Sequence, residues 1–375
     1  MSHDTSVRRC VRVAWLVAPW LTVALAGRLL AQSVVGPPSE PMGGGGVSEV
    51  TTGPAEPAGL QVDDTGSGSE SNGVFEPGEW VTVAPSWKNA SGDVIELTGV
   101  GTGLEGPGSA SYLVADGSAR YGAIVPEATA SCLDTGDCYA LHVSPMFPRP
   151  LHWDAVFNEV ASGAGSNITQ AWTVHLGDSF SDVPRGDANY RYVETLLHHG
   201  VVTGCGSGQF CPHDDTTRAQ AAVLVLASEY GPGSAPVPCT PGQERFTDVL
   251  ASNPFCPWVE ELARRGSVLD CPDGSNLYCP GKTMQRGEMA FAIVKTRRPP
   301  DYSPLACAPG AEAFKDVLAS DPLCPWIEEL AHDLQGTSPH DPVCAPDVFC
   351  PQDVMQRGSA TRFLAAGLGL QLYGR

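Results

Sequence analysis

The cysteines are the residues whose spacing points most directly to chemistry. The chain has 13 of them in 375 residues, and twelve lie between residues 132 and 350. A zinc site needs Cys-x-x-Cys pairs or histidines at ligand spacing, and neither pattern occurs, so no metal site is expected. If the chain is exported, an even number of closely spaced cysteines favours disulfides. The spacings predict six pairs: Cys132–Cys138, Cys205–Cys211, Cys239–Cys256, Cys271–Cys279, Cys307–Cys324 and Cys344–Cys350.

Three arginines form a second group of candidate residues. Each stands at the start of an apolar run: Arg218, Arg286 and Arg357. Thr217 is a good N-cap and Gln220 completes a capping box, so a helix is expected to begin at Arg218. A cation there opposes the helix dipole, but a guanidinium beside free amides would attract a carboxylate or phosphate. The arginines are therefore candidates for binding an acidic sugar, and the alternatives are internal ion pairs or exposed surface.

The arginines belong to an internal repeat that must position them. Phe-x-Asp-Val occurs at residues 180, 246 and 314, at spacings of 66 and 68 residues, and each copy leads through a cysteine-bounded loop to the arginine. Such repetition predicts one supersecondary unit used three times, in residues 178–230, 239–298 and 307–375. The aspartates of the repeats, which are the alternative partners of the arginines, are Asp182, Asp248 and Asp316.

Residues 61–177 have a different pattern. Short runs of alternating apolar residues, such as 80–83 and 171–176, are separated by Gly, Pro, Asn and Asp, which predicts an antiparallel β-sandwich. Residues 32–60 are rich in Gly and Pro and are expected to form a linker. The expected fold class is thus multidomain β + α, with a β-sandwich followed by an α-helical triple repeat.

An acidic segment at the start of this region is a weaker candidate site. Oxygen ligands for Ca²⁺ could come from Asp63, Asp64, Glu70, Asn72, Glu76 and Glu79. Their spacing matches no EF-hand loop, so a solvated turn is the favoured interpretation.

The N-terminus predicts the compartment. Residues 8–12 are basic, residues 13–27 are uncharged and mostly apolar, and small residues follow near Ala26 and Ala31. This order is typical of a secretory signal peptide, expected over residues 1–31 and including Cys10. The alternative is a membrane anchor, but fifteen residues containing Pro19 span a bilayer poorly. We therefore expect a secreted protein of the cell surface, cell wall or periplasm, with no transmembrane segment after cleavage.

The net charge of the chain excludes some classes of binding partner. The net charge is −20, and removal of residues 1–31 takes away four arginines and one aspartate, which changes it to −23. A chain this acidic lacks the electrostatic footprint for binding nucleic acid. The 42 glycines and 33 prolines also argue against a long helical bundle.

The repeats resemble S-layer homology (SLH) motifs. The first is the clearest, with Phe180-Ser-Asp-Val-Pro, Gly200-Val-Val-Thr-Gly204, Phe210-Cys-Pro and Thr217-Arg-Ala-Gln220. The resemblance implies a pseudo-threefold helical unit that binds cell-wall or envelope polysaccharide between its motifs and anchors the protein. It also implies a set of glycan-binding residues: Arg218, Arg286, Arg357, Asp182, Asp248, Asp316, Tyr190, Trp258 and Trp326.

The chain departs from the SLH pattern in several places. The family's Thr-Arg-Ala-Glu becomes Gln285-Arg-Gly-Glu288 and Gln356-Arg-Gly-Ser359, so that only the arginine persists. The third repeat lacks the Gly-Val-Val-x-Gly turn, which puts its groove in doubt, and the cysteine pairs are not part of the general pattern. Core packing is an alternative role for the two tryptophans.

Residues 72–79 resemble the Asn-Gly-x-x-x-Pro-Gly-Glu turn that opens Ig-like bacterial envelope domains. With no serine-hydrolase or zinc-protease motif in the chain, we expect a non-enzymatic protein without a cofactor. It would display a β-sandwich and bind an envelope polysaccharide, an acidic one being a good fit. The alternative is a module for protein–protein interaction or surface-layer assembly, with other surface proteins as partners.

Overall fold

The computed structural model of the chain describes residues 53–62, 70–163, 165–231, 235–271, 273–333, 344–345 and 347–367. The predicted signal peptide and most of the predicted linker lie outside these residues. Among the residues described, no helix combines the length and the apolar character needed to cross a membrane.

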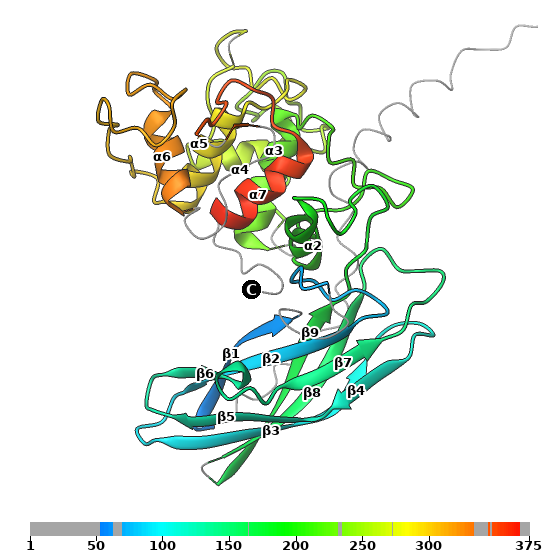
Figure 1. Ribbon diagram of the computed structural model, residues 1–375. Helices are drawn as coiled ribbons and strands as arrows, with labels where there is room; N and C mark the ends of the chain where they lie inside the picture. The colour runs from blue at the N-terminus through cyan, green and yellow to red at the C-terminus, as the bar shows by residue number, and fades with distance from the viewer. Residues whose placement is uncertain are drawn as a thin grey trace, which may run out of the picture.

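The N-terminal part consists of two antiparallel sheets (Figure 1). One has the strand order β1-β2-β7-β4 with β6 paired to β2, and the other has the order β5-β3-β8-β9. The strands are β1 (Ala55–Val62), β2 (Trp80–Asn89), β3 (Ile95–Glu105), β4 (Tyr112–Asp116), β5 (Ser118–Ile124), β6 (Thr129–Ser131), β7 (Tyr139–Val143), β8 (Asp154–Gly163) and β9 (Ser166–His175). Alternate residues such as Val81 and Val83 of β2, and Ala155 and Phe157 of β8, are buried in a common core, as the two-residue period of a strand requires.

The sheet part begins earlier than the sequence indicated. Strand β1 starts at Ala55, inside the segment 32–60 that was predicted to be a linker. The sequence did not predict this strand because it contains Pro57 and Gly59, and both residue types are rare inside strands. They are tolerated here because β1 pairs with β2 alone and its register shifts between them, as is typical of an edge strand.

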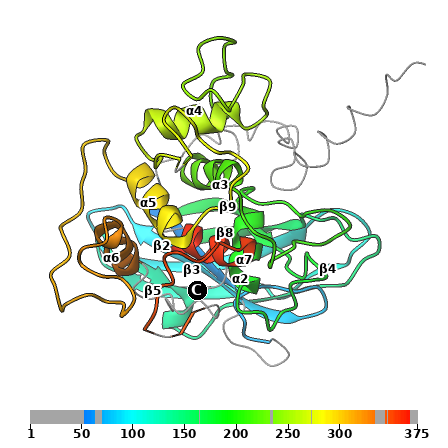
Figure 2. The same cartoon turned by 90° about the horizontal axis from the view of Figure 1, so that it is seen from above.

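The C-terminal part is helical in the residues described. Its helices are α2 (Tyr190–His198), α3 (Arg218–Tyr230), α4 (Cys256–Arg264), α5 (Arg286–Arg297), α6 (Cys324–Asp333) and α7 (Arg357–Gly367). The helices that begin with arginine, α3, α5 and α7, contact one another, and α4, α6 and α2 pack on α3, α5 and α7 respectively. Figure 2 shows α4 and α6 on the outside of this group. One apolar core runs through all three segments.

All six predicted disulfides are present, and each closes a local loop of 17 residues or fewer. Three of them staple the loop that precedes an arginine helix: Cys205–Cys211, Cys271–Cys279 and Cys344–Cys350. Cys239–Cys256 and Cys307–Cys324 fix the first residue of α4 and of α6 to the preceding segment, and Cys132–Cys138 closes a loop of the sheet part. In the chain-entropy model, closing such a loop stabilises the fold by about 2–3 kcal/mol.

Candidate functional site

Each Phe-x-Asp-Val aspartate holds the cysteine loop of its own segment. The Asp248 carboxylate accepts the backbone N–H groups of Tyr278 (2.8 Å) and Cys279 (2.7 Å). In the first segment, Asp182 accepts the N–H groups of Phe210 and Cys211, both at 2.7 Å. In the third, Asp316 accepts those of Phe349 (2.8 Å) and Cys350 (2.7 Å). The second cysteine of each loop has a φ of +57° to +59°, which is costly for a residue with a Cβ. The two charge-assisted bonds offset that cost.

Removal of one carboxylate should therefore loosen its loop. We expect Asp248→Ala to lower the free energy of unfolding by about 2 kcal/mol, since hydrogen bonds to a charged group are at stake. Urea denaturation with the disulfides intact measures this. Asp301→Ala, at an exposed position, is the control and should change stability by less than about 0.5 kcal/mol. Equal stabilities of the two variants would show that the Asp248 carboxylate does not stabilise its loop.

The three repeat arginines are buried and reach into a neighbouring segment. Their exposed fractions are 2–5%: Arg218, Arg286 and Arg357. Arg218 Nε donates to the carbonyl of Tyr278 in the second segment (2.9 Å), and Nη2 donates to the carbonyl of Leu269 (2.7 Å). Its Nη1 pairs with the carboxylate of Glu288 at 3.1 Å. The guanidinium thus joins the first segment to the second.

The other two arginines continue the same connection. Arg286 Nε donates to the carbonyl of Phe349 in the third segment (2.9 Å), and Arg357 Nε donates to the carbonyl of Phe210 in the first (3.1 Å). Each guanidinium also lies 4.7–5.4 Å from the ring centre of the same aromatic residue. One aromatic residue per loop is therefore held at its N–H by an aspartate of its own segment and at its carbonyl by an arginine of another.

Backbone hydrogen bonds close the connection into a ring. The N–H of Thr216 donates to the carbonyl of Met355, that of Met355 to Met284, and that of Met284 to Thr216, each at 2.8 Å. These residues stand two positions before the three repeat arginines. The three segments are consequently joined in a cycle, and none of them can form these bonds alone.

These contacts contradict the anion-binding site that was expected at the N-termini of the arginine helices. The capping box of Thr217 and Gln220 is present. However, the N–H of Arg218 donates to Lys282 and that of Ala219 to Pro280, so these amides are already occupied by carbonyls of the second segment. Equivalent bonds cover the first amides of α5 and α7. The internal alternative also differs from expectation, because the repeat aspartates accept backbone amides and Arg218 pairs with Glu288.

A cavity beside Arg218 shows how little room the guanidinium has. It is lined by Tyr278, Glu288 and Phe291 among others, and its volume is about 10 Å³. That is near the minimum for one water molecule, so a sugar ring does not fit beside this guanidinium in the arrangement seen here.

The aromatic candidates occupy two different positions. Trp258 and Trp326 are the third residues of α4 and α6, and the residue at that place in α2 is Tyr192. All three are partly buried against the helical core. Tyr190, which the resemblance implied, instead opens α2, where α4 and α6 begin with a disulfide-bonded cysteine. Tyr192, Trp258 and Trp326 are each followed by a buried Val or Ile. Aligning the three helices on that buried residue places Tyr192, not Tyr190, with the tryptophans.

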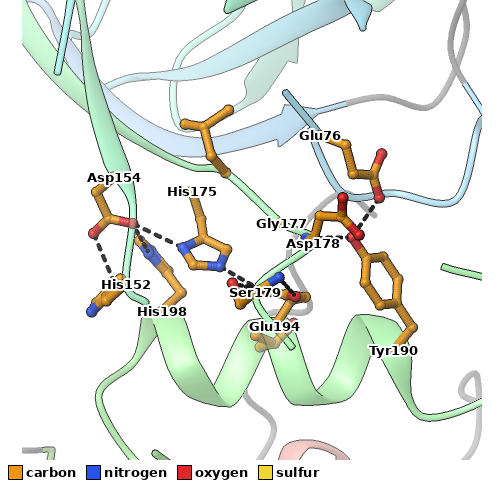
Figure 3. Close-up of polar contacts among 12 residues, drawn as sticks. Glu76, His152, Asp154, His175, Gly177, Asp178, Ser179, Tyr190, Glu194 and His198 are labelled. Atoms are coloured by element: carbon orange, nitrogen blue, oxygen red, sulfur yellow. Dashed lines mark hydrogen bonds and ion pairs between the residues drawn. The ribbon is translucent and has the colours of Figure 1, made fainter. Parts of the chain in front are cut away.

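Tyr190 ties α2 to the sheet part (Figure 3). Its hydroxyl donates to Glu76 Oε1 (2.6 Å) and accepts the N–H of Asp178 (2.8 Å). Glu76 also accepts from Asn72 Nδ2 at 2.8 Å. Glu76 and Glu79 have exposed fractions of 0% and 6%, so the solvated turn expected here is wrong for these two residues. Glu70 is exposed as expected, and Asp63 and Asp64 lie outside the described residues. This acidic turn is part of the junction between the two parts of the molecule.

Comparison with known proteins bears on the helical part. Residues 179–222 match the family model of the S-layer homology domain. The match supports a non-catalytic module for association with the cell surface in this part of the chain. No curated protein matches the chain. Among solved structures, the GAE domain of GGA2p from Saccharomyces cerevisiae matches at 11% identity with a TM-score of 0.18, covering 32% of this chain and 96% of that one.

Proposed function

We propose that this protein is a non-enzymatic cell-envelope protein whose helical part binds a cell-wall or envelope polysaccharide and anchors an Ig-like sheet domain. One observation carries the proposal: the aspartate–aromatic–arginine contact of the segment with the SLH match recurs in the two segments that the match does not cover. Three equivalent segments joined in a cycle support a single pseudo-threefold SLH-like unit.

The seams between paired helices are the proposed polysaccharide sites. In the α2–α7 seam Arg362 lies 5.0 Å from the ring of Tyr192, and in the α5–α6 seam Lys295 lies 5.6 Å from the ring of Trp326. Trp258 occupies the equivalent place in the α3–α4 seam. An aromatic face offers apolar surface to a sugar ring, and a nearby cation suits an acidic substituent. On this proposal the buried arginines and aspartates shape the seams without touching the polymer.

Electrostatics limits how binding can occur. The net charge of −20 repels an acidic polymer at long range, whereas contacts within a Debye length are governed by local groups. Binding through the seams would therefore be short-ranged and would depend on the aromatic contacts.

Co-sedimentation with purified cell-wall sacculi or envelope polysaccharide tests the proposal on the exported chain. We expect the wild type to sediment with the polymer and Trp258→Ala/Trp326→Ala to bind at least about tenfold more weakly, which corresponds to about 1.4 kcal/mol. Trp80→Ala is the matched control, since this tryptophan is 45% exposed on the sheet part and should leave binding unchanged.

Two outcomes would overturn parts of the proposal. A wild-type chain that stays in solution while forming assemblies with itself would favour the surface-layer assembly alternative. Equal binding by the wild type and the double tryptophan variant would move the polysaccharide site away from the seams.

A further inference from the structure

Three histidines and one aspartate meet at the junction between the sheets and α2 (Figure 3). His152 precedes β8, Asp154 begins β8, His175 ends β9 and His198 ends α2. One ligand atom from each of the four lies within 4.8 Å of all the others. Residues far apart in the sequence thus converge on one point.

The distances fit a small tetrahedral site. Asp154 Oδ1 lies 2.9 Å from His175 Nδ1 and 3.3 Å from His198 Nδ1, and Asp154 Oδ2 lies 3.1 Å from His152 Nε2. Zinc–nitrogen and zinc–oxygen bonds of about 2.0–2.2 Å place tetrahedral ligand atoms roughly 3.3 Å apart. Small side-chain rotations would therefore bring the four atoms around one ion.

A buried carboxylate orients the histidine at the base of the cluster. His175 has no exposed surface, and its Nε2 lies 2.9 Å from Glu194 Oε2, whose exposed fraction is 1%. Glu194 is held in turn by the N–H (2.9 Å) and the hydroxyl (2.8 Å) of Ser179. When Nε2 donates to Glu194, the lone pair of Nδ1 points toward Asp154 and the other histidines. Metal-bound histidines are commonly oriented by such a carboxylate.

We propose that His152, Asp154, His175 and His198 bind one divalent transition-metal ion, with zinc as the best fit. Three imidazole nitrogens and one carboxylate suit zinc better than calcium or magnesium, which take oxygen ligands. Four protein ligands complete a tetrahedron, as in structural zinc sites, and leave no position for a reacting water. The ion would fasten α2 to β8 and β9 and so fix the helical part against the sheets.

The site has an entrance and a rigid base. The side chains of His152 and His198 are 41% and 20% exposed, whereas His175 is fully buried. Nearby, Arg149 donates to the carbonyls of Leu176 and Asp178 at 2.7 and 3.1 Å, which holds the chain that connects the two parts. An ion could therefore enter from the side of His152 without opening the junction.

Cysteine clusters do not compete with this site in the oxidised protein. The other groups with metal-ligating side chains within the described residues each contain two cysteines that form a disulfide. A metal-binding cysteine must be a free thiolate. Binding experiments must therefore be made without reducing agent.

Equilibrium dialysis of the full exported chain against Zn²⁺, followed by elemental analysis, tests the proposal. We expect one ion per chain, a higher melting temperature with Zn²⁺ than with a chelator, and a tetrahedral visible spectrum with Co²⁺. His152→Ala should weaken zinc binding at least about tenfold and remove the rise in melting temperature. His213→Ala, at an exposed position outside the cluster, should bind like the wild type.

The outcomes separate a metal site from a metal-free group of ion pairs. No stoichiometric uptake by the folded wild type would overturn the proposal, as would zinc uptake that His152→Ala and Asp154→Asn leave unchanged. Because His152 is the most exposed member, its variant should fold even if Asp154→Asn does not, and circular dichroism checks this.

Discussion

An Arg218→Met variant is expected to lose about 3 kcal/mol of unfolding free energy, as is typical when one partner of a buried charged network is removed. Methionine keeps the apolar length of the side chain but removes the guanidinium donors from the carbonyls of Tyr278 and Leu269 and the cation that pairs with Glu288. The damage should therefore appear in the second segment, although the substitution is in the first. Urea denaturation measures the loss, and hydrogen exchange at the amides of Tyr278 and Cys279 should become faster.

Arg264→Met is the matched control. The side chain of Arg264 is 68% exposed and pairs with Glu261 on the surface of α4, where solvent screens an ion pair and leaves it little effect on stability. The two variants distinguish the roles proposed for the repeat arginine. If Arg218→Met were as stable as Arg264→Met but no longer bound polysaccharide, the arginine would be a ligand contact and its role in joining segments would be wrong.

The repeat made much of the helical part predictable from sequence. Three copies of Phe-x-Asp-Val, each followed by a cysteine-bounded loop and an arginine, located the segments. Short spacings were enough to pair the ten cysteines of these segments and the two of the sheet part. Such pairs are local, so linear distance along the chain decides them. The helix start at Arg218 followed from its capping box for the same reason.

Contacts between segments were not predictable in this way. The sequence located Arg218 at a helix start, but nothing in a single repeat shows that its guanidinium crosses to Tyr278 of the next. The first repeat also lacks the Cys-Pro that opens α4 and α6, so the sequence alone pairs Tyr190 with the tryptophans in place of Tyr192. The first residue of α4 and of α6 is a cysteine held by a disulfide. The first residue of α2 is Tyr190, which is held instead by its hydrogen bond to Glu76 of the sheet part.

The histidine cluster shows the same limit. Each histidine of the cluster lies 23 residues after the previous one: His152, His175 and His198. This spacing is too long for a local ligand motif, and the three meet only because β8 pairs with β9 and α2 packs near the ends of these strands. Asp154 and His175 are opposite each other in the register of those strands. A correct strand alignment of residues 154–175 would have brought these two together, but the approach of His198 depends on how the helical part meets the sheets.

The junction should also make stability depend on pH through Glu76. Its exposed fraction is 0%, and burial, followed by the neighbouring Glu79, raises its pKa from 4.5 to about 9, against the lowering effect of the bonds from Tyr190 and Asn72. Below pH 4.5 the carboxyl is protonated in both the folded and the unfolded chain. Above it, the unfolded chain releases the proton while the folded chain keeps it, so the free energy of unfolding falls until the pH passes about 9.

A Glu76→Gln variant should remove most of that fall, because its amide carries no proton to release. A pKa difference of one pH unit corresponds to about 1.4 kcal/mol. Even if burial raised the pKa of Glu76 by only about two pH units, the variant would gain roughly 2 kcal/mol over the wild type between pH 5 and pH 8.5. Calorimetric melting at the two pH values measures the difference, and other titrating groups cancel because both chains contain them. Glu127→Gln, whose side chain is 73% exposed beside Lys88, should follow the wild type. If Glu76→Gln melted in parallel with the wild type across this range, Glu76 would already be ionised in the folded chain, and the bonds from Tyr190 and Asn72 would outweigh its burial.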